Sequence, residues 1–222
     1  MPEAGLRERK KARTRRVIAD AAARLFAERG YEQVAVSDVA REAEVSEQTV
    51  YNYFQTKEQL VTDLDQDFQD QISRLIRTRA PGTTPAAAIR ELVLDAVEGI
   101  RRVPPAQWRG ELGYLAAISP TVHRLALEMS DRQAQAIAAV LRETSAVTPA
   151  LARLHGIALA GVFQIIISEA GRRTQEGQSQ DEIADELRPA IEGVLADIDR
   201  WLAPGASKRP RAATPARTPK QP

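Results

Sequence analysis

The segment from Val45 to Lys57, VSEQTVYNYFQTK, constrains this chain more than any other stretch. Ser46 suits the start of a helix, because its hydroxyl accepts a hydrogen bond from a first-turn backbone N–H group. Val50 and Phe54 are four residues apart and share a face that can bury against a small core. The opposite face carries amides and hydroxyls, whereas a merely solvated helix usually carries Glu and Lys. We therefore expect a helix in the DNA major groove, where amides read base edges and hydroxyls bind phosphate.

The residues before this segment predict two more helices. A long helix is expected from about Arg7 to Arg29, followed by Gly30, since glycine readily adopts the left-handed conformation that closes a helix. A short second helix follows, and Glu44 lies in the turn before the helix capped by Ser46. Three helices in this arrangement form a helix-turn-helix unit. Its expected apolar positions in the first two helices are Val17, Ile18, Ala21, Ala22, Leu25, Phe26, Val36, Val39, Ala40 and Ala43.

Three motifs here resemble the tetracycline-repressor (TetR) family: FAERGY at 26–31, DVAREA at 38–43 and VSxxTVYxYFxxKExL at 45–60. The match is specific, because several spaced positions must agree together. It covers the first quarter of the chain and implies an all-helical homodimeric regulator with an N-terminal DNA-binding domain and a larger C-terminal ligand and dimer domain. Two positions depart from the pattern. Ala35 stands where the family usually has a capping Thr, and Glu44 stands where the turn often has Gly.

The resemblance also implies roles for the polar residues of this region. Gln48 and Asn52 would contact base edges. The further candidates for contacts in the groove are Ser46 and Glu47. The residues expected to hold phosphates are Thr49, Tyr51, Tyr53 and Lys57, and Ser37 would supply a polar contact in place of the missing Thr.

Positive charge is local. Residues 1–60 hold 11 Lys and Arg against 10 Asp and Glu, whereas residues 61–203 hold 15 against 20. The basic residues that crowd the N-terminus are Arg7, Arg9, Lys10, Lys11, Arg13, Arg15 and Arg16. Such a cluster is typical of phosphate contact, while an acidic body would be repelled by the DNA backbone. A solvated helix end is the alternative, and the neighbouring helix-turn-helix pattern favours DNA.

Capping signals divide the rest of the chain into helices. Thr56 with Gln59 forms a capping box, which predicts a helix running without a linker from the DNA-binding unit to Leu75. Further helix starts are indicated by Thr84-Pro85, Pro104-Pro105, Ser119-Pro120, Thr148-Pro149 and the pair Ser179 and Glu182. These signals predict an all-α, nine-helix, two-domain architecture.

The expected domains are an N-terminal basic arm with a tri-helical DNA-binding domain at 1–55 and a helical effector-binding and dimerisation domain at 56–203. The tail at 204–222 has five basic residues, five prolines and no acidic residue, so we expect it to be disordered.

Two late helices are expected to form a dimer interface. Within residues 151–172 the run GIALAGVFQIII is apolar nearly all round, which indicates burial on more than one side. The small residues that would let a neighbouring helix approach are Gly156, Ala158, Ala160 and Gly161. The last helix, about 180–202, carries an apolar stripe, and Pro189 should kink it or loosen its first turns. Two helices from each subunit would form a four-helix bundle. Burial inside one subunit is the alternative, and the resemblance favours dimerisation.

A ligand pocket is indicated only indirectly. The candidate wall residues are Phe68, Trp108, Tyr114, Phe163 and Gln164. Aromatic side chains with few polar groups suit an apolar or aromatic effector. The same residues can equally be plain core, and the resemblance favours a pocket.

The sequence lacks the residue patterns of metal, cofactor and catalytic sites. The chain has two His and no Cys, and no carboxylates are clustered with them at ligand spacing, so neither a metal nor a cofactor is expected. His123 and His155 are expected to be ordinary helix residues, and the alternative is that they are pocket groups. No GxSxG, P-loop or dinucleotide fingerprint is present, and an enzyme is not expected. The lack of cysteine fits a reducing cytoplasm. A membrane-spanning segment is not expected, because no run approaches the roughly twenty apolar residues that one needs.

The sequence therefore predicts a ligand-responsive transcriptional regulator in the cytoplasm. It would be a repressor that binds a palindromic operator in double-stranded DNA as a homodimer, has no membrane partner, and is released by a small apolar or aromatic effector. A constitutive architectural DNA-binding protein without an effector is the alternative, and the acidic body argues against it. A helical enzyme is a third class, opposed by the absence of a catalytic set.

Overall fold

The structure is a computed structural model that describes residues 2–62 and 65–203. Within those ranges it is all-α, without strands, as predicted. The elements are α1 (Pro2–Arg29), α2 (Val36–Glu42), α3 (Glu47–Tyr53), the 3-10 turn η1 (Glu58–Leu60), α4 (Asp65–Arg77), α5 (Pro85–Arg102), α6 (Pro105–Trp108), α7 (Leu112–Ile118), α8 (Pro120–Thr144), α9 (Pro149–Gln175) and α10 (Gln180–Leu202). Nine of these described α-helices have seven residues or more, which is the predicted number, and α6 is a single turn of four residues. The predicted basic tail lies outside the described residues.

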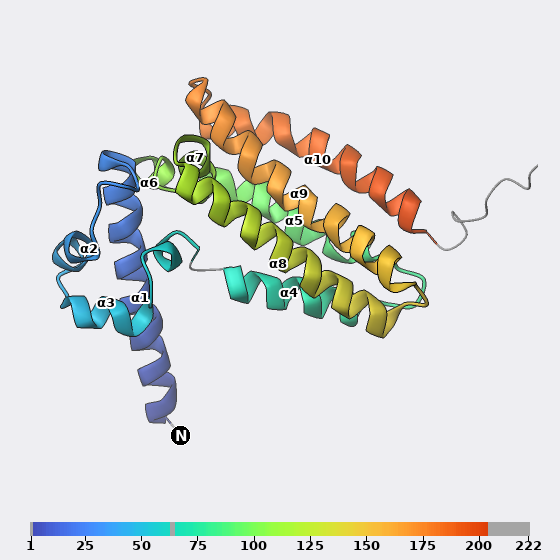
Figure 1. Ribbon diagram of the computed structural model, residues 1–222, viewed down its shortest axis with the longest axis horizontal. Helices are drawn as coiled ribbons and strands as arrows, with labels where there is room; N and C mark the ends of the chain where they lie inside the picture. The colour runs from blue at the N-terminus through green and yellow to red at the C-terminus, as the bar shows by residue number, and fades with distance from the viewer. Residues whose placement is uncertain (1, 63–64, 204–222) are drawn as a thin grey trace, which may run out of the picture.

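The long helices α5, α8, α9 and α10 run side by side along the molecule, with α4 packed beneath α8 (Figure 1). The first three helices form a separate unit at one end, and α6 and α7 lie between that unit and the long helices (Figure 1). A single apolar core joins α4, α5, α8, α9 and α10. Its fully buried members include Ile72, Ile89, Ile137, Leu159 and Leu187. The body is thus a helical bundle held by one core.

The core of the DNA-binding end continues into the body. Phe26 of α1 and Val50 of α3 belong to the same buried cluster as Leu115 of α7 and Val122 of α8. At the same junction, a Cβ atom built on Gly110 would lie 1.8 Å from the backbone oxygen of Ala23. Only glycine therefore lets the segment between α6 and α7 approach α1 this closely. The N-terminal unit is docked on α6, α7 and the start of α8.

A polar contact reinforces this junction. The hydroxyl of Ser119 hydrogen-bonds the carboxylate of Glu32 in the loop after α1, and it also accepts from Val122 N at 3.1 Å. One side chain therefore caps α8 and ties it to the DNA-binding unit.

The predicted caps of the later helices are confirmed. The hydroxyls of Thr84, Ser119, Thr148 and Ser179 each accept a hydrogen bond from the backbone N–H group three residues on. The box formed by Ser179 and Glu182 is complete, since Ser179 N donates to Glu182 Oε2 at 2.8 Å. Helix α10 runs unbroken across Pro189.

Three expectations about the N-terminal half were wrong. Helix α1 begins at Pro2 rather than near Arg7. Val17, placed in the buried stripe, is 43% exposed, whereas its neighbour Ile18 is 0% exposed, so Val17 lies on the outer side of α1. The helix expected from Thr56 to Leu75 is not continuous, since only residues 58–60 form a 3-10 turn, residues 61–62 are non-helical and α4 starts at residue 65.

The capping box expected at Thr56 is also replaced by a different bond. Gln59 Oε1 accepts from the backbone nitrogen of Gln55, not Thr56, at 2.6 Å. This local turn tightens the exit from α3 instead of opening a long α-helix.

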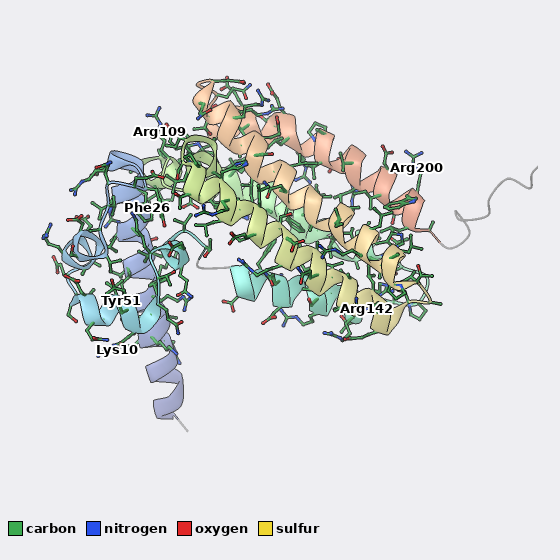
Figure 2. All side chains as sticks on the ribbon, in the orientation of Figure 1. Lys10, Phe26, Tyr51, Arg109, Arg142 and Arg200 are labelled. Atoms are coloured by element: carbon green, nitrogen blue, oxygen red, sulfur yellow. The ribbon has the colours of Figure 1, made fainter. Side chains whose placement is uncertain are left out.

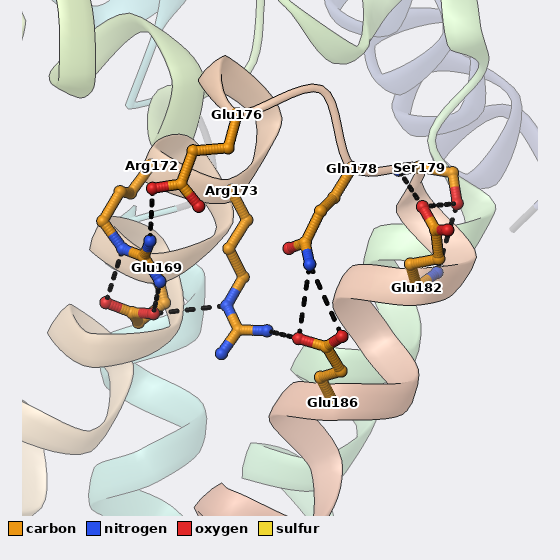
Figure 3. Close-up of polar contacts among 8 residues, drawn as sticks. All are labelled: Glu169, Arg172, Arg173, Glu176, Gln178, Ser179, Glu182 and Glu186. Carbon is orange, nitrogen blue, oxygen red and sulfur yellow. Dashed lines mark hydrogen bonds and ion pairs between the residues drawn. The ribbon is translucent and has the colours of Figure 1, made fainter.

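The corner between α9 and α10 is held by charged side chains (Figure 3). Arg172 lies 2.7 Å from Glu169, and Arg173 bridges from the same Glu169 at 3.2 Å to Glu186 on α10. Gly177 turns the chain with φ +87°, in the left-handed region that favours glycine. These contacts hold α9 and α10 as a pair.

Helix α9 is apolar, as expected. Its mean hydropathy reaches 1.8 over an 18-residue window, so length and composition alone would allow it to cross a membrane, and the expectation that no run approaches a membrane span was wrong. In the structure 44% of that window is buried, and α9 packs on α7, α8 and α10. This is the behaviour of a core helix in a bundle, and the apolar window is weak evidence for a membrane span.

Candidate nucleic-acid interface and effector site

Helix α3 is fixed on its inner side and open on its outer side. Ser46 caps it as predicted, accepting from Thr49 N at 3.1 Å, and the hydroxyls of these two residues lie 2.8 Å apart. Val50 and Phe54 are 0% and 1% exposed. A buried stripe and a satisfied N-terminus hold so short a helix in one orientation.

The outer side of α3 presents amides and a phenol. Gln48, Tyr51 and Asn52 are exposed, and Gln48 Nε2 donates to Asn52 Oδ1 at 3.2 Å. That bond aligns two amides one turn apart on the same face. In Figure 2, Tyr51 and Lys10 lie at the end of the molecule remote from Arg142 and Arg200. The face is therefore well placed to meet a large polar partner.

The other predicted DNA-binding residues differ in solvent exposure and in their contacts within the protein. Glu47 is exposed in the first turn of α3, whereas Ser37 in the first turn of α2 is half-buried. Tyr53 is half-buried and packs against the core. Lys57 holds its ammonium 4.2 Å from the centroid of the Tyr31 ring, and partial burial lowers its pKa. Lys57 is thus already engaged within the protein.

The two departures from the family pattern have structural consequences. Ala35 gives α2 no side-chain cap, but its backbone nitrogen donates to Asp38 Oδ2 at 3.0 Å. That hydrogen bond, with the nearby Arg41 guanidinium, holds the pKa of Asp38 below its usual value. Glu44 adopts φ +54°, which a non-glycine residue rarely does and which explains why glycine suits this turn.

The basic arm is part of α1. Its exposed basic side chains are Arg9, Lys10, Lys11, Arg13 and Arg16. The guanidinium of Arg15 lies 5.0 Å from the centroid of the Phe54 ring, a contact that joins the arm to the end of α3 and that sequence reasoning missed. Its signal in the sequence is faint, because nothing local relates two residues so far apart.

The five candidate effector residues do not form one group. Phe68 and Phe163 meet edge to face with ring centroids 4.9 Å apart, and Oε1 of the neighbouring Gln164 is buried with no hydrogen-bond partner in the described structure. Trp108 instead donates to Thr174 Oγ1 at 3.0 Å. Eleven residues of α9 separate Thr174 from Phe163, about 16 Å of helix.

Tyr114 is also apart from the aromatic pair. Its ring lies beneath the Arg109 guanidinium, 5.8 Å from the centroid. Two cavities of about 520 and 230 Å³ lie elsewhere, and none of the five residues lines either.

The outward face of α9 is apolar. Leu154, Ile157 and Ile165 are 49%, 49% and 41% exposed. A Cβ atom on Gly161 would meet nothing within 4 Å, whereas one on Gly156 would lie 2.3 Å from Ala134 O of α8. Of these two small residues, Gly156 therefore serves packing inside the chain, and Gly161 belongs to the open face.

The two histidines show no catalytic arrangement. His123 is exposed, while His155 is 8% exposed with its ring edge to face against Trp201, at a centroid distance of 4.8 Å. Burial lowers the pKa of His155. Among the described residues, no group of three or more His, Cys, Asp or Glu side chains could hold a metal ion.

Comparisons with known proteins agree with this geometry. Residues 18–64 match the family described as "Bacterial regulatory proteins, tetR family". The chain is 27% identical over 150 residues to the HTH-type transcriptional regulator TcmR of Streptomyces glaucescens, covering 68% of this chain and 62% of TcmR. It is 38% identical over 61 residues to the HTH-type dhaKLM operon transcriptional activator DhaS of Lactococcus lactis, covering 27% and 33%. The chain thus spans less than two thirds of the curated relatives it matches.

Solved structures show the same fold over most of the chain. Native NalD of Pseudomonas aeruginosa, the secondary repressor of the MexAB-OprM multidrug efflux pump, superposes with a TM-score of 0.56 at 19% identity, covering 87% of this chain and 99% of NalD. A SmeT–triclosan complex gives a TM-score of 0.57 at 15% identity, covering 93% and 99%.

A helix-turn-helix whose outer face carries amides and a phenol, docked on a helical bundle, defines a DNA-binding transcriptional regulator. The matching residues include the whole of α2, the turn and α3. Its DNA-binding region, residues 18–64, matches the TetR family of transcriptional regulators.

Proposed function

We propose that this protein is a ligand-responsive repressor that binds a palindromic operator as a homodimer and leaves it when a small apolar or aromatic effector binds. Residues 1–55 would hold the DNA, and residues 56–203 would provide the effector site and the dimer interface. Both would operate in the cytoplasm. The observation that carries the proposal is the outer face of α3, where the bonded amides of Gln48 and Asn52 stand exposed beside Tyr51.

The roles along α3 follow from what each group can reach. Gln48 and Asn52 would read base edges, because an amide offers both a donor and an acceptor to a base. Tyr51 would hold a phosphate, and the exposed arm of α1 would add charge contacts along the backbone. Lys57 would contribute only after leaving the Tyr31 ring. Ser37, Ser46, Glu47, Thr49 and Tyr53 stay as candidates at the margin of this surface.

The open face of α9 supports dimerisation. Ile157, Gly161 and Ile165 recur every four residues and thus share one face of the helix. Beside it on α10, a Cβ atom on Gly193 would meet nothing within 4 Å, and Trp201 is 42% exposed. A second copy of the same pair would bury these surfaces in a four-helix bundle. Two recognition helices would then lie about 34–36 Å apart, one turn of duplex.

The effector would bind beside Phe68, Phe163 and Gln164, where an aromatic pair lies next to an unsatisfied amide oxygen. Trp108 and Tyr114, farther along the bundle, would line an extension of that site. The break after η1 makes a rigid α4 an unsuitable route to the DNA. The route that the contacts support instead is the junction of α6, α7 and α8 with α1, where Ser119 meets Glu32.

The test is a footprint of the protein on its operator with and without candidate small molecules. We expect a symmetric protected site that an effector removes. Coupling is reciprocal, so saturating operator must weaken effector binding by the same factor, equivalent to about 1–3 kcal/mol. Equal effector affinity with and without operator, for every molecule that binds, would favour the architectural alternative.

A further inference from the structure

A cavity of about 520 Å³ lies at the end of the body opposite the DNA-binding unit. We call it the distal pocket. It is lined by the end of α4, the loop leading to α5, the end of α8 and the loop before α9, with one residue each from α9 and the end of α10. Its volume is in the range of small-molecule sites. The residues used in the argument are Arg77, Arg79, Leu141, Val147, His155 and Leu202.

The lining is basic. Its charged groups are two arginines, and it has no Asp or Glu among the residues that the structure describes. Burial lowers the pKa of the lining His155 and so favours its neutral form. Arg77 pairs at 3.0 Å with Glu143, and both of these side chains are at least half exposed. Arg79 is half-buried and donates to oxygens of Ile76, Thr144 and Ser145.

Arg79 therefore has no carboxylate partner among the residues that the structure describes. Its partners in the described structure are carbonyl and hydroxyl oxygens, and none of them is a carboxylate. These bonds hold the guanidinium in place at the edge of the cavity. A fixed, partly desolvated cation attracts an anion more strongly than a mobile surface cation does.

The rest of the wall is apolar. Leu141 is 1% exposed, and Val147 and Leu202 pack against the main core. We propose that the distal pocket binds a small organic carboxylate, whose charged end pairs with Arg79 and whose apolar body lies against these three side chains. This site is separate from the proposed effector site, because none of its lining residues belongs to the group around Phe163.

The chemistry of the wall disfavours other occupants. A metal cation would meet two arginines, and the basic segment that follows Leu202 carries charge of the same sign. Inorganic phosphate would satisfy the charge but would leave the apolar surface in contact with water. A carboxylate with a hydrocarbon body complements both parts.

The chain contains a reporter for this site. It has only two tryptophans, and Trp201 lies against His155, which lines the pocket, while Trp108 lies near Thr174 at the other end of α9. Fluorine NMR of 5-fluorotryptophan-labelled protein should therefore separate the two ends. Titration with a series of alkyl and aryl carboxylates, including 4-phenylbutanoate, should shift Trp201 saturably and leave Trp108 unchanged. The neutral 4-phenylbutanamide should bind roughly tenfold more weakly, because it lacks the charge that Arg79 attracts.

Variants then locate the site. Arg79→Gln should weaken carboxylate binding roughly tenfold or more. Arg74→Gln, which lies on α4 five residues before Arg79 and outside the lining, should not change it. Because Arg79 also holds the end of α8, Ala146→Trp serves as a second variant. It fills the pocket from an exposed position and leaves the hydrogen bonds of Arg79 in place. Circular dichroism and thermal unfolding verify that both variants are folded.

Three outcomes would overturn the proposal. The first is that no carboxylate in the series shifts Trp201 at millimolar concentration. The second is that binding does not depend on the site: 4-phenylbutanamide binds as tightly as 4-phenylbutanoate, or Arg79→Gln and Ala146→Trp both keep full affinity for the carboxylate. The third is a shift of Trp108 alone, which would place the carboxylates at the proposed effector site. Operator binding by the free protein is unaffected by these outcomes, so the proposed repressor function is tested separately.

Discussion

Helices α3 and α9 each bury one face and expose the other, but the exposed faces have opposite chemistry. On α3, Val50 is buried while Gln48 and Asn52 are exposed on the other face. On α9, Leu159 is buried while Ile157 and Ile165 are exposed. Polar groups gain little by leaving water unless a partner replaces their hydrogen bonds, while apolar groups gain simply by leaving it. The contrast matches the two partners that we propose: the edges of base pairs for α3, and a second copy of the bundle for α9.

The largest expected effect comes from a charge on the apolar face. In the single chain Ile165 is 41% exposed, so Ile165→Asp should fold with little loss of stability. In a dimer the same carboxylate would be buried without a partner, which is costly. We expect monomers in analytical ultracentrifugation and loss of operator binding. Leu127→Asp, at a residue 48% exposed on α8, is the matched control and should remain dimeric. Monomers of Ile165→Asp that bind the full operator with unchanged affinity would refute the role of this face.

Substitutions on the polar face of α3 should change the base-pair preference of operator binding. Gln48→Ala should cost about 1–3 kcal/mol on the correct operator and relax the preference at one base pair. Tyr51→Phe should weaken binding to all sequences alike, because a phosphate contact carries no base information. Binding measured against a set of single-base operator variants separates the two patterns. An unchanged base preference in Gln48→Ala would show that Gln48 does not contact a base edge.

The junction between the two regions should be sensitive to one added methyl group. Gly110→Ala would place a Cβ atom 1.8 Å from Ala23 O, so α1 or the segment between α6 and α7 must move. We expect the free energy of unfolding to fall by about 1–3 kcal/mol, the usual effect of overpacking.

Gly99→Ala is the matched control for this junction. Its Cβ atom would meet only Arg102, at 3.6 Å, inside helix α5, so the change should raise stability by up to about 1 kcal/mol. Denaturant unfolding measures both variants. Equal stability of Gly110→Ala and the unmodified protein would mean that the junction is not tightly packed.

The smallest expected effect concerns a carboxyl group at the same junction. Burial, and secondarily the charge of Asp20, raise the pKa of Glu111 above its ordinary 4.5. A carboxyl whose folded-state pKa is raised loses stability as the pH rises from 4.5 through the folded-state value. Glu111→Gln should therefore raise the melting temperature at pH 7, and the gain should disappear below pH 4.5. A lower melting temperature at pH 7 would show that the ionised carboxylate is favourably paired.

Local signals predicted much of this molecule because they act within a few residues. The hydroxyl of Ser46 and those of Thr84, Ser119 and Thr148 bond backbone groups three positions away, so each helix start could be read from the sequence. The burial of Val50 and Phe54 followed from their spacing. The all-α class and the family followed from the same local patterns.

Features that depend on distant packing could not be read in this way. Val17 was assigned to the buried stripe but is exposed, while the adjacent Ile18 is fully buried, so the edge of the stripe lies between these two residues. The docking of α7 on α1, and the engagement of Lys57 by Tyr31, bring together residues that no sequence period relates. The candidate effector residues were chosen by type alone, and Trp108 proves to contact Thr174, which lies about 16 Å along α9 from Phe163.

The most direct test of the central claim is the composition and symmetry of the complex with DNA. An operator selected from random sequence, analysed by footprinting and by the mass of the complex, gives both. We predict chains bound in pairs on a symmetric site whose half-site centres are about 34–36 Å apart, and loss of binding when five base pairs, about half a turn, are inserted between them. One chain bound to an asymmetric site, with affinity unchanged by the insertion, would contradict the account.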